Sequence, residues 1–211
     1  MQLFLLARWW YLKSICLYLR TSKCYTNLLL ETMCTVAFFG FLRCGEFTVD
    51  SVNNFDPCFN LCMSDIIITD DCVFLTLKCS KTDPFRKGVT IKLFSTQKII
   101  CPVKTCCQFL QYRWLKNPES NSPLFVDDIG LPMTRQKFLC KLKEILNYLG
   151  YNANHYSGHS FRIGAATTAG SVHIEDHMIK ILGRWASESY CRYIKISDKV
   201  LKTTQNSLVC E

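Results

Sequence analysis

The chain has 211 residues, of which 49% are hydrophobic, and its 25 Lys and Arg residues against 17 Asp and Glu residues give a formal net charge of +8. This apolar content is ample for the buried core of one generous domain, and neither an internal repeat nor a low-complexity tract is present. The positive balance favours a polyanionic partner such as nucleic acid, although charge of this size also serves solubility.

The N-terminal segment MQLFLLARWWYLKSICLYLR is apolar but carries Arg8, Lys13 and Arg20, and no small-residue cleavage site follows it. We therefore expect neither a signal peptide nor a membrane span. Without export, the 14 cysteines should stay reduced, most of them as small apolar core residues. The expected location is nuclear or cytoplasmic.

No metal site is expected, because no two cysteines have the two-residue spacing of a zinc knuckle. His173 and His177 in VHIEDHMIK would share one helical face, but no Glu directly follows the first His as it does in zincins. We interpret them as a helix-surface pair. A cysteine-rich zinc-binding interaction domain is kept as the weaker alternative.

In chain order, residues 23–42 carry apolar groups at helical spacing and become continuously apolar, which predicts a helix buried on most sides and stopped near Gly45. Three β-rich runs follow at 65–69, 72–79 and 88–94. Polar turns separate them, so they predict a small antiparallel meander.

Helical periodicity returns in CPVKTCCQFLQYRWL, where Pro102 suits the first turn of a helix. The polar stretch NPESNSPLFVDDIGLP predicts a connector with Leu124 and Phe125 tucked beneath it. From TRQKFLCKLKEILNYLG onward the chain is expected to be helical to near its end, with Gly150 as a stop. The predicted fold class is α+β, mainly α, with one small three-stranded antiparallel sheet.

Four separate places carry unusual polar and aromatic residues. Arg43 follows the buried helix, Lys81 lies in the turn between the second and third β-rich runs, and His159 and Arg162 stand three apart in GHSFRIGAATTAG. Downstream, LGRWASESYCRYIK supplies a Trp and two tyrosines. In order and context these segments resemble the catalytic domain of the tyrosine recombinases, or phage integrase family, with the DIRS-like and Crypton mobile-element type most similar.

The resemblance extends over nearly the whole chain. It implies that residues 1–211 form a single catalytic domain, with a core at about 10–196 and a C-terminal tail at 197–211. The N-terminal core-binding domain that relatives close around the duplex is expected to be absent. Fewer phosphates would then be neutralised, which would weaken DNA binding.

The implied activity is cleavage and rejoining of DNA strands through a 3′-phosphotyrosyl intermediate, with no cofactor. By resemblance, Tyr193 is the nucleophile. Arg43 and Arg162 are implied to present forked donors to the phosphate oxygens. His159 would assist the tyrosine proton or bind the phosphate, and Lys81 would protonate the leaving 5′ oxygen.

The resemblance also assigns supporting roles. Trp185 stands where many relatives carry a second His, and its ring N–H can donate one hydrogen bond but exchanges no proton at neutral pH. Glu46, three residues after Arg43, is expected to hold His159 or an arginine in orientation. Contacts to DNA are expected from three further basic residues, namely Arg86, Lys87 and Arg184.

Two questions stay open at this point. Tyr190 lies three residues before Tyr193, so helical spacing alone does not exclude it as the nucleophile. The chain could also be a catalytically inactive DNA-binding remnant of a mobile-element recombinase. In either case the expected partners are double-stranded DNA and further copies of the chain, as a tetramer on DNA, with no membrane and no small-molecule substrate.

Overall fold

The helices of this protein pack around one buried helix, α2 (Tyr25–Phe39), ten of whose fifteen residues are buried. In the computed structural model the described residues are 9–78, 88–193, 202 and 205–206. The other helices are α1 (Trp9–Leu19), α3 (Pro102–Trp114), α4 (Arg135–Tyr148), α5 (Ser160–Ser171) and α6 (Asp176–Gly183), and the strands are β1 (Ile66–Ile68), β2 (Cys72–Leu77) and β3 (Val89–Phe94). Helices α1, α3 and α5 all contact α2. The predicted class, mainly helical with a small antiparallel sheet, is confirmed.

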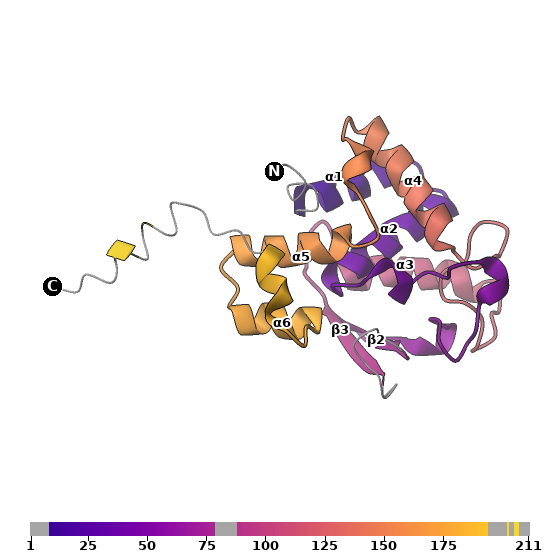
Figure 1. The fold of residues 1–211 in the computed structure, drawn as a ribbon. Coiled ribbons are helices and arrows are strands. Elements are labelled where there is room, and N and C mark those ends of the chain that lie inside the picture. Colours follow the sequence, from indigo (N-terminus) through magenta and orange to yellow (C-terminus); the bar gives the residue numbers. More distant parts are fainter. Residues whose placement is uncertain (1–8, 79–87, 194–201, 203–204, 207–211) are drawn as a thin grey trace.

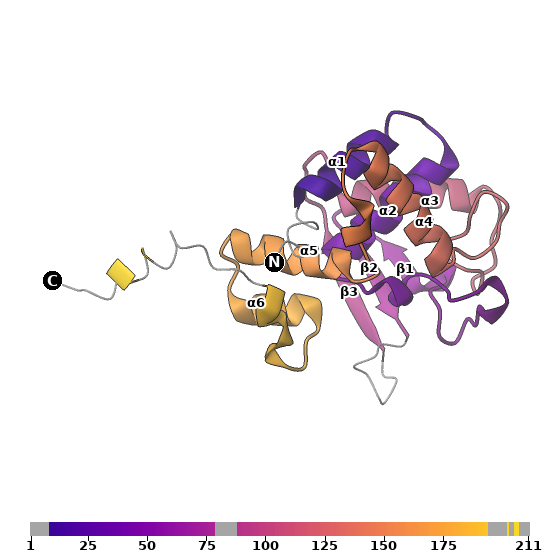
Figure 2. The same cartoon turned by 45° about the horizontal axis from the view of Figure 1, so that its top comes forward.

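The sheet has the order β1-β2-β3, and both pairs are antiparallel. Its inner face packs against α3, as the two ribbon views show (Figures 1 and 2). Alternation explains why: Val73 pairs with Leu93 and both are buried, whereas Phe74 pairs with Lys92 on the outer face. The three predicted strands are confirmed to within two residues at each end.

Local signals in the second half of the chain also behave as predicted. Pro102 begins α3, where its missing N–H costs nothing. Thr134 caps α4 by accepting a hydrogen bond from the Lys137 backbone N–H. The connector between α3 and α4 buries Leu124 and Phe125 completely or nearly so. These features depend on neighbours in the sequence, which is why the sequence alone predicts them.

Helix α2 does not run to Gly45, so that prediction is wrong. The helix ends at Phe39, and Phe41 takes a left-handed conformation with φ of 50°. The Phe41 N–H bonds the Phe38 carbonyl and the Leu42 N–H bonds the Ala37 carbonyl, which is the Schellman pattern. A Phe at this position is unusual, because the left-handed region favours glycine.

The last third of the chain is mostly helical, as expected: α4 is followed by Gly150 with φ of 77°, and α5 and α6 come after it. His173 has φ of 60° and ends α5 by the same pattern, with Ile174 N–H bonded to the Ala169 carbonyl. His173 therefore lies in the turn before α6, while His177 lies within α6. The two histidines do not share a helical face.

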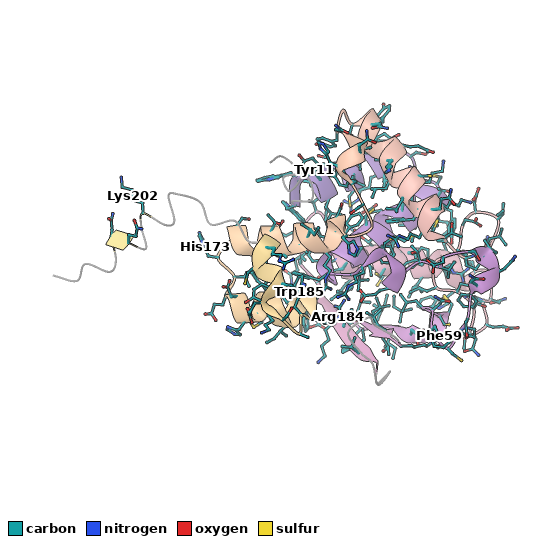
Figure 3. The ribbon with its side chains drawn as sticks, viewed as in Figure 1. Tyr11, Phe59, His173, Arg184, Trp185 and Lys202 are labelled. Atoms are coloured by element: carbon teal, nitrogen blue, oxygen red, sulfur yellow. The ribbon has the colours of Figure 1, made fainter. Side chains whose placement is uncertain are left out.

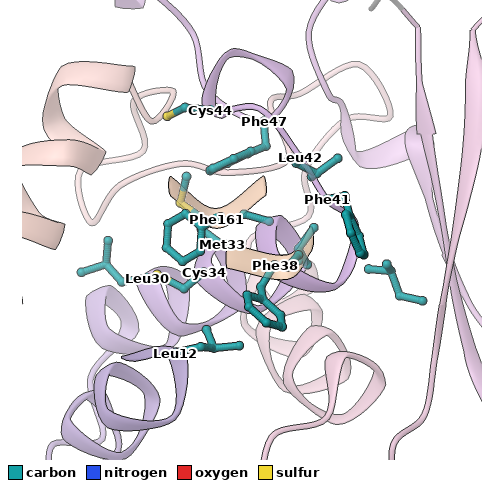
Figure 4. Close-up of a cluster of buried hydrophobic side chains, with 14 of the residues drawn as sticks. Leu12, Leu30, Met33, Cys34, Phe38, Phe41, Leu42, Cys44, Phe47 and Phe161 are labelled. Atoms are coloured by element: carbon teal, nitrogen blue, oxygen red, sulfur yellow. The ribbon is translucent and has the colours of Figure 1, made fainter. Parts of the chain in front are cut away.

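One hydrophobic core joins these elements. Figure 4 shows side chains from α1 and α2, from the segment after α2 and from α5 meeting in a single cluster, including Leu12, Met33, Phe47 and Phe161. Within the described residues the cysteines are free thiols, and most of them are buried. No helix in the described part of the chain is long and apolar enough to cross a membrane.

Candidate active site

The segment after α2 and the beginning of α5 are joined directly. The Cys44 N–H donates to the Gly158 carbonyl at 3.0 Å. Cys44 opens the short 3₁₀ helix η1 (Cys44–Glu46), and Gly158 precedes His159, which stands immediately before α5. Residues that flank this bond, Arg43 on one side and His159 on the other, are therefore brought to the same region of the molecule.

Gly158 is needed for this approach. A Cβ at that position would lie 3.0 Å from the Cys44 Cβ and 3.0 Å from Nη2 of Arg135. Both distances are shorter than ordinary van der Waals contact, so a larger residue would push the two segments apart. Arg135 begins α4 with its side chain exposed. Its guanidinium is thus placed beside the junction.

Arg162 and His159 differ in exposure. Arg162 is buried at 3% exposure, and its Nη1 donates to the Phe41 carbonyl at 2.8 Å. His159 is exposed, and its backbone N–H donates to Ser157 Oγ at 3.3 Å. Arg162 is thus fixed in the interior, whereas the His159 side chain is open to solvent.

Trp185 packs over Arg162. The guanidinium carbon lies 4.2 Å from the ring centre, a cation–π contact. The Trp185 ring also meets Phe41 edge to face, at 6.2 Å and 89°, and lies 5.9 Å from the Tyr190 ring. These contacts account for the unusual left-handed conformation of Phe41, because its ring packs against Trp185 and its carbonyl accepts a hydrogen bond from Arg162.

Glu46 binds two arginines. Its Oε1 accepts from Arg43 Nη1 at 3.0 Å, and its Oε2 accepts from the Arg43 backbone N–H at 2.8 Å. Oε2 also accepts from Arg184 Nη2 at 3.1 Å. Arg184 Nη1 donates further to the Gly40 carbonyl at 2.8 Å.

The charge of this cluster is positive. Arg43, Arg162 and Arg184 gather around the segment 40–46, and Glu46 supplies one carboxylate between two of them. Burial lowers the pKa of the Arg184 guanidinium, Glu46 opposes that effect, and Arg43 adds to it. Such a cluster is suited to binding an anion with several oxygen atoms.

The two tyrosine candidates sit in the 3₁₀ helix η5 (Glu188–Tyr193), which the Lys180 to Glu188 ion pair ties to α6. Tyr190 is buried at 3% exposure against Trp185. The Glu188 carboxylate raises the pKa of the Tyr190 hydroxyl. Tyr193 ends η5, and its side chain lies outside the described residues.

The predicted site residues fall into two groups. The structure brings together Arg43, Glu46, Arg162, Arg184 and Trp185, with His159 next to them across the Cys44 to Gly158 bond. The side chains of the other predicted residues lie outside the described part of the chain, namely Lys81, Arg86, Lys87 and Tyr193. Their assigned roles stay predictions. The contact of Arg184 with DNA also stays a prediction. Its guanidinium bonds the Gly40 carbonyl and Glu46, and its side chain is 13% exposed.

Sequence reasoning missed Arg135. Its position in the sequence could have indicated it. A basic residue in the first turn of a helix interacts unfavourably with the helix dipole, so its presence there indicates a contact elsewhere. Among the described residues, no group of three His, Cys, Asp or Glu side chains could hold a metal ion.

No family model and no curated protein matches this sequence. Solved structures do match its fold. The XerH site-specific recombinase bound to difH substrate in a pre-cleavage complex superposes with a TM-score of 0.70 at 16% identity, over 100% of this chain and 56% of that chain. The XerA recombinase gives 0.65 at 16% identity, over 95% and 63% respectively. A lambda integrase dimer bound to a COC′ core site gives 0.58 at 15% identity, over 90% and 47%.

The protein therefore has the fold of the tyrosine recombinase catalytic domain. It spans less than two thirds of the length of each of these three neighbours. The TM-scores of 0.58 to 0.70 show a shared fold, at sequence identities of only 15–16%. Activity has to be argued from the site itself.

Proposed function

We propose that this protein is a tyrosine recombinase catalytic domain that cleaves and rejoins double-stranded DNA. The observation that carries the proposal is the cluster in which Arg162 lies under Trp185 while Glu46 holds Arg43 beside it. Forked guanidinium donors fixed in a partly buried site are suited to the non-bridging oxygens of a phosphodiester, whose charge grows during displacement.

The proposed reaction needs no added nucleotide or metal. The Tyr193 hydroxyl attacks the phosphorus, its proton passes to His159, and the bond from phosphorus to the 5′ oxygen breaks. Lys81 gives a proton to that departing oxygen. In the reverse step a 5′ hydroxyl attacks the phosphotyrosine, which restores both the strand and the free tyrosine. The bond energy is stored in the phosphotyrosine, so rejoining needs no external energy source.

Electrostatics support DNA as the substrate. The chain carries a formal net charge of +8. At the site, two arginines pair with the Glu46 carboxylate, and Arg162 bonds the nearby Phe41 carbonyl. The solved neighbours include a recombinase bound to its difH substrate and an integrase bound to a core site. We propose double-stranded DNA as the partner, several copies of the chain acting together on it, and a mobile element as its origin, which would place it in a nucleus.

A nicked suicide substrate tests this proposal. When the tyrosine cuts near a nick, the short released strand diffuses away, rejoining fails and the covalent adduct accumulates. The chain, incubated with such DNA in a chelator and without nucleotide, should yield a protein–DNA adduct that survives denaturation. Retarded DNA without any adduct would instead favour the inactive DNA-binding remnant.

A further inference from the structure

Arg184 occupies an uncommon backbone position at the end of α6. Its φ of 55° is left-handed, and the Arg184 N–H bonds the Ile181 carbonyl while the Trp185 N–H bonds the Lys180 carbonyl. This is again the Schellman pattern, in which glycine is preferred at the left-handed residue. Glycine is available one position earlier, as Gly183, yet arginine takes the strained place. A residue held in such a conformation is expected to make contacts that compensate.

The shortest side-chain hydrogen bonds of Arg184 go to the segment after α2. Arg184 Nη1 donates to the Gly40 carbonyl at 2.8 Å, and Nη2 donates to Glu46 Oε2 at 3.1 Å. The guanidinium therefore spans from the end of α2 to η1. Figure 3 shows Arg184 and Trp185 together on the side of α6 that faces the body of the molecule.

Glu46 transmits this contact to Arg43. One carboxylate oxygen receives Arg184 together with the Arg43 backbone N–H, and the other receives Arg43 Nη1. With both oxygens engaged, the carboxylate has one orientation. The position of Oε1 then directs the Arg43 guanidinium, because Nη1 donates a charge-assisted hydrogen bond to that oxygen.

We propose that Arg184 is a positioning residue, which orients Arg43 through the Glu46 carboxylate and makes that orientation depend on the docking of α6. The proposal rests on the proposed function, since Arg43 is taken there to contact the scissile phosphate. Helix α6 also leads directly into Trp185 and η5. Docking of α6 would thus prepare the arginine and deliver the tyrosine segment in one step.

The geometry requires arginine at this position. The Gly40 carbonyl and the Glu46 carboxylate are reached by different nitrogens of the same guanidinium. A lysine carries one ammonium group at the end of a flexible stem and cannot hold both acceptors in this fixed arrangement. Arg184→Lys should therefore keep the positive charge and lose the orientation.

The test separates orientation from DNA contact. Arg184→Gln and Arg184→Lys are compared with Arg20→Gln in the full chain. Arg20 is a matched control, since it also pairs with a glutamate, Glu31, and with a backbone carbonyl, that of Ile99, but its contacts are made with residues outside the site. Adduct formation at saturating nicked DNA, DNA affinity and thermal unfolding are measured for each variant.

We expect both Arg184 variants to slow adduct formation by about tenfold or more at saturating DNA, as small misplacements of a catalytic group do. The positioning role replaces the DNA contact expected of Arg184 from the sequence, so DNA affinity should stay within about twofold in both variants. In an Arg43→Lys background the Arg184 substitution should cause no further loss, since coupled residues are not additive. Arg20→Gln should lower thermal stability and leave the rate unchanged.

A second measurement does not need activity. The Arg43 Nε–H signal is identified in the nitrogen-15 spectrum of the unmodified chain by its disappearance in Arg43→Lys. The signal should shift or broaden in both Arg184 variants and stay unchanged in Arg20→Gln. An unchanged Arg43 signal would overturn the proposal, as would weakened DNA binding with a normal rate at saturation. If the unmodified chain forms no adduct, the proposed function fails, and the Arg43 signal still decides the positioning role.

Discussion

The guanidinium carbon of Arg162 lies 4.2 Å from the centre of the Trp185 ring. This contact joins α5 to the segment after α6. The same guanidinium donates a hydrogen bond of 2.8 Å to the carbonyl of Phe41, in the segment after α2. Arg162 is therefore held by groups from two other parts of the chain. The arrangement makes Trp185 a support for the Arg162 guanidinium as well as a core residue.

Replacing Trp185 should destabilise the protein and release Arg162. Trp185→Ala leaves a cavity between Phe41 and the guanidinium, and we expect a loss of about 3–5 kcal/mol in the free energy of unfolding. Trp185→Phe keeps an aromatic face and should lose less, since the cation–π contact is weakened but retained. Urea unfolding measures the free energy of unfolding of both variants. Trp114→Ala is the control, because that ring is 55% exposed and its loss should matter little.

Gly183→Ala should destabilise the protein even though alanine favours helices. A Cβ at Gly183 would lie 1.5 Å from Cζ3 of Trp185, so the ring must move. Helix propensity alone predicts a gain of up to about 1 kcal/mol, whereas overpacking predicts a loss of about 1–3 kcal/mol. Gly45→Ala, where the added atom meets open space, is the matched control for thermal unfolding. A stabilised Gly183→Ala variant would show that the ring is not packed there.

Tyr193→Phe should abolish the covalent adduct on nicked DNA, while Tyr190→Phe should retain it. Tyr190 packs against Trp185 at 3% exposure, and the Glu188 carboxylate raises the pKa of its hydroxyl, which makes it a poorer nucleophile. Denaturing gel electrophoresis of each variant with labelled DNA reads the outcome. The opposite pattern would assign the nucleophile to Tyr190.

Binding to duplex DNA should weaken steeply with salt and depend little on sequence. Each neutralised phosphate should contribute about 0.9 to the slope of log affinity against log salt, because counterions are released on binding. Fluorescence anisotropy with two unrelated duplexes at several salt concentrations measures the slope. Equal affinity at low and high salt would contradict phosphate contact as the source of binding.

Acid should remove a specific part of the stability through Asp127. Burial would raise the pKa of this carboxyl, but hydrogen bonds from Lys137 Nζ at 2.7 Å and from the Leu131 and Ile129 N–H groups lower it below its ordinary value. Because the folded pKa is lower than the unfolded one, the stabilisation is present above about pH 4 and is lost as pH falls through the folded pKa.

Asp127→Asn tests this sign. At about pH 6 the variant should be less stable than the unmodified chain by roughly 1–3 kcal/mol, since Lys137 loses its charged partner. The difference should begin to shrink as the pH falls below about 4, the ordinary pKa of an Asp carboxyl, and should vanish only below the lower folded pKa. Urea unfolding at several pH values gives both curves. A difference that stays constant with pH would show that the ionised carboxylate is not what stabilises the connector.

Features set by neighbouring residues were predictable. β-rich runs bounded by polar turns placed the three strands, and Pro102 marked a helix start. Both depend on backbone preference within a short segment, so the sequence by itself determined them. The order of Arg43, His159, Arg162 and Trp185 suggested one site through its resemblance to the tyrosine recombinase catalytic domain.

The helix ends and the contacts of the site were decided only by the tertiary structure. Phe41 and Arg184 take left-handed conformations that no local rule assigns to them, because the compensating partners, Trp185 for the first and Glu46 for the second, are distant in the sequence. The sequence likewise placed Glu46 near an arginine, yet the second arginine, Arg184, reaches it only because the end of α6 lies beside the Gly40 carbonyl. Local preferences amount to about 1 kcal/mol, and packing between distant segments exceeds them, which is why the fold decides where the arginines point.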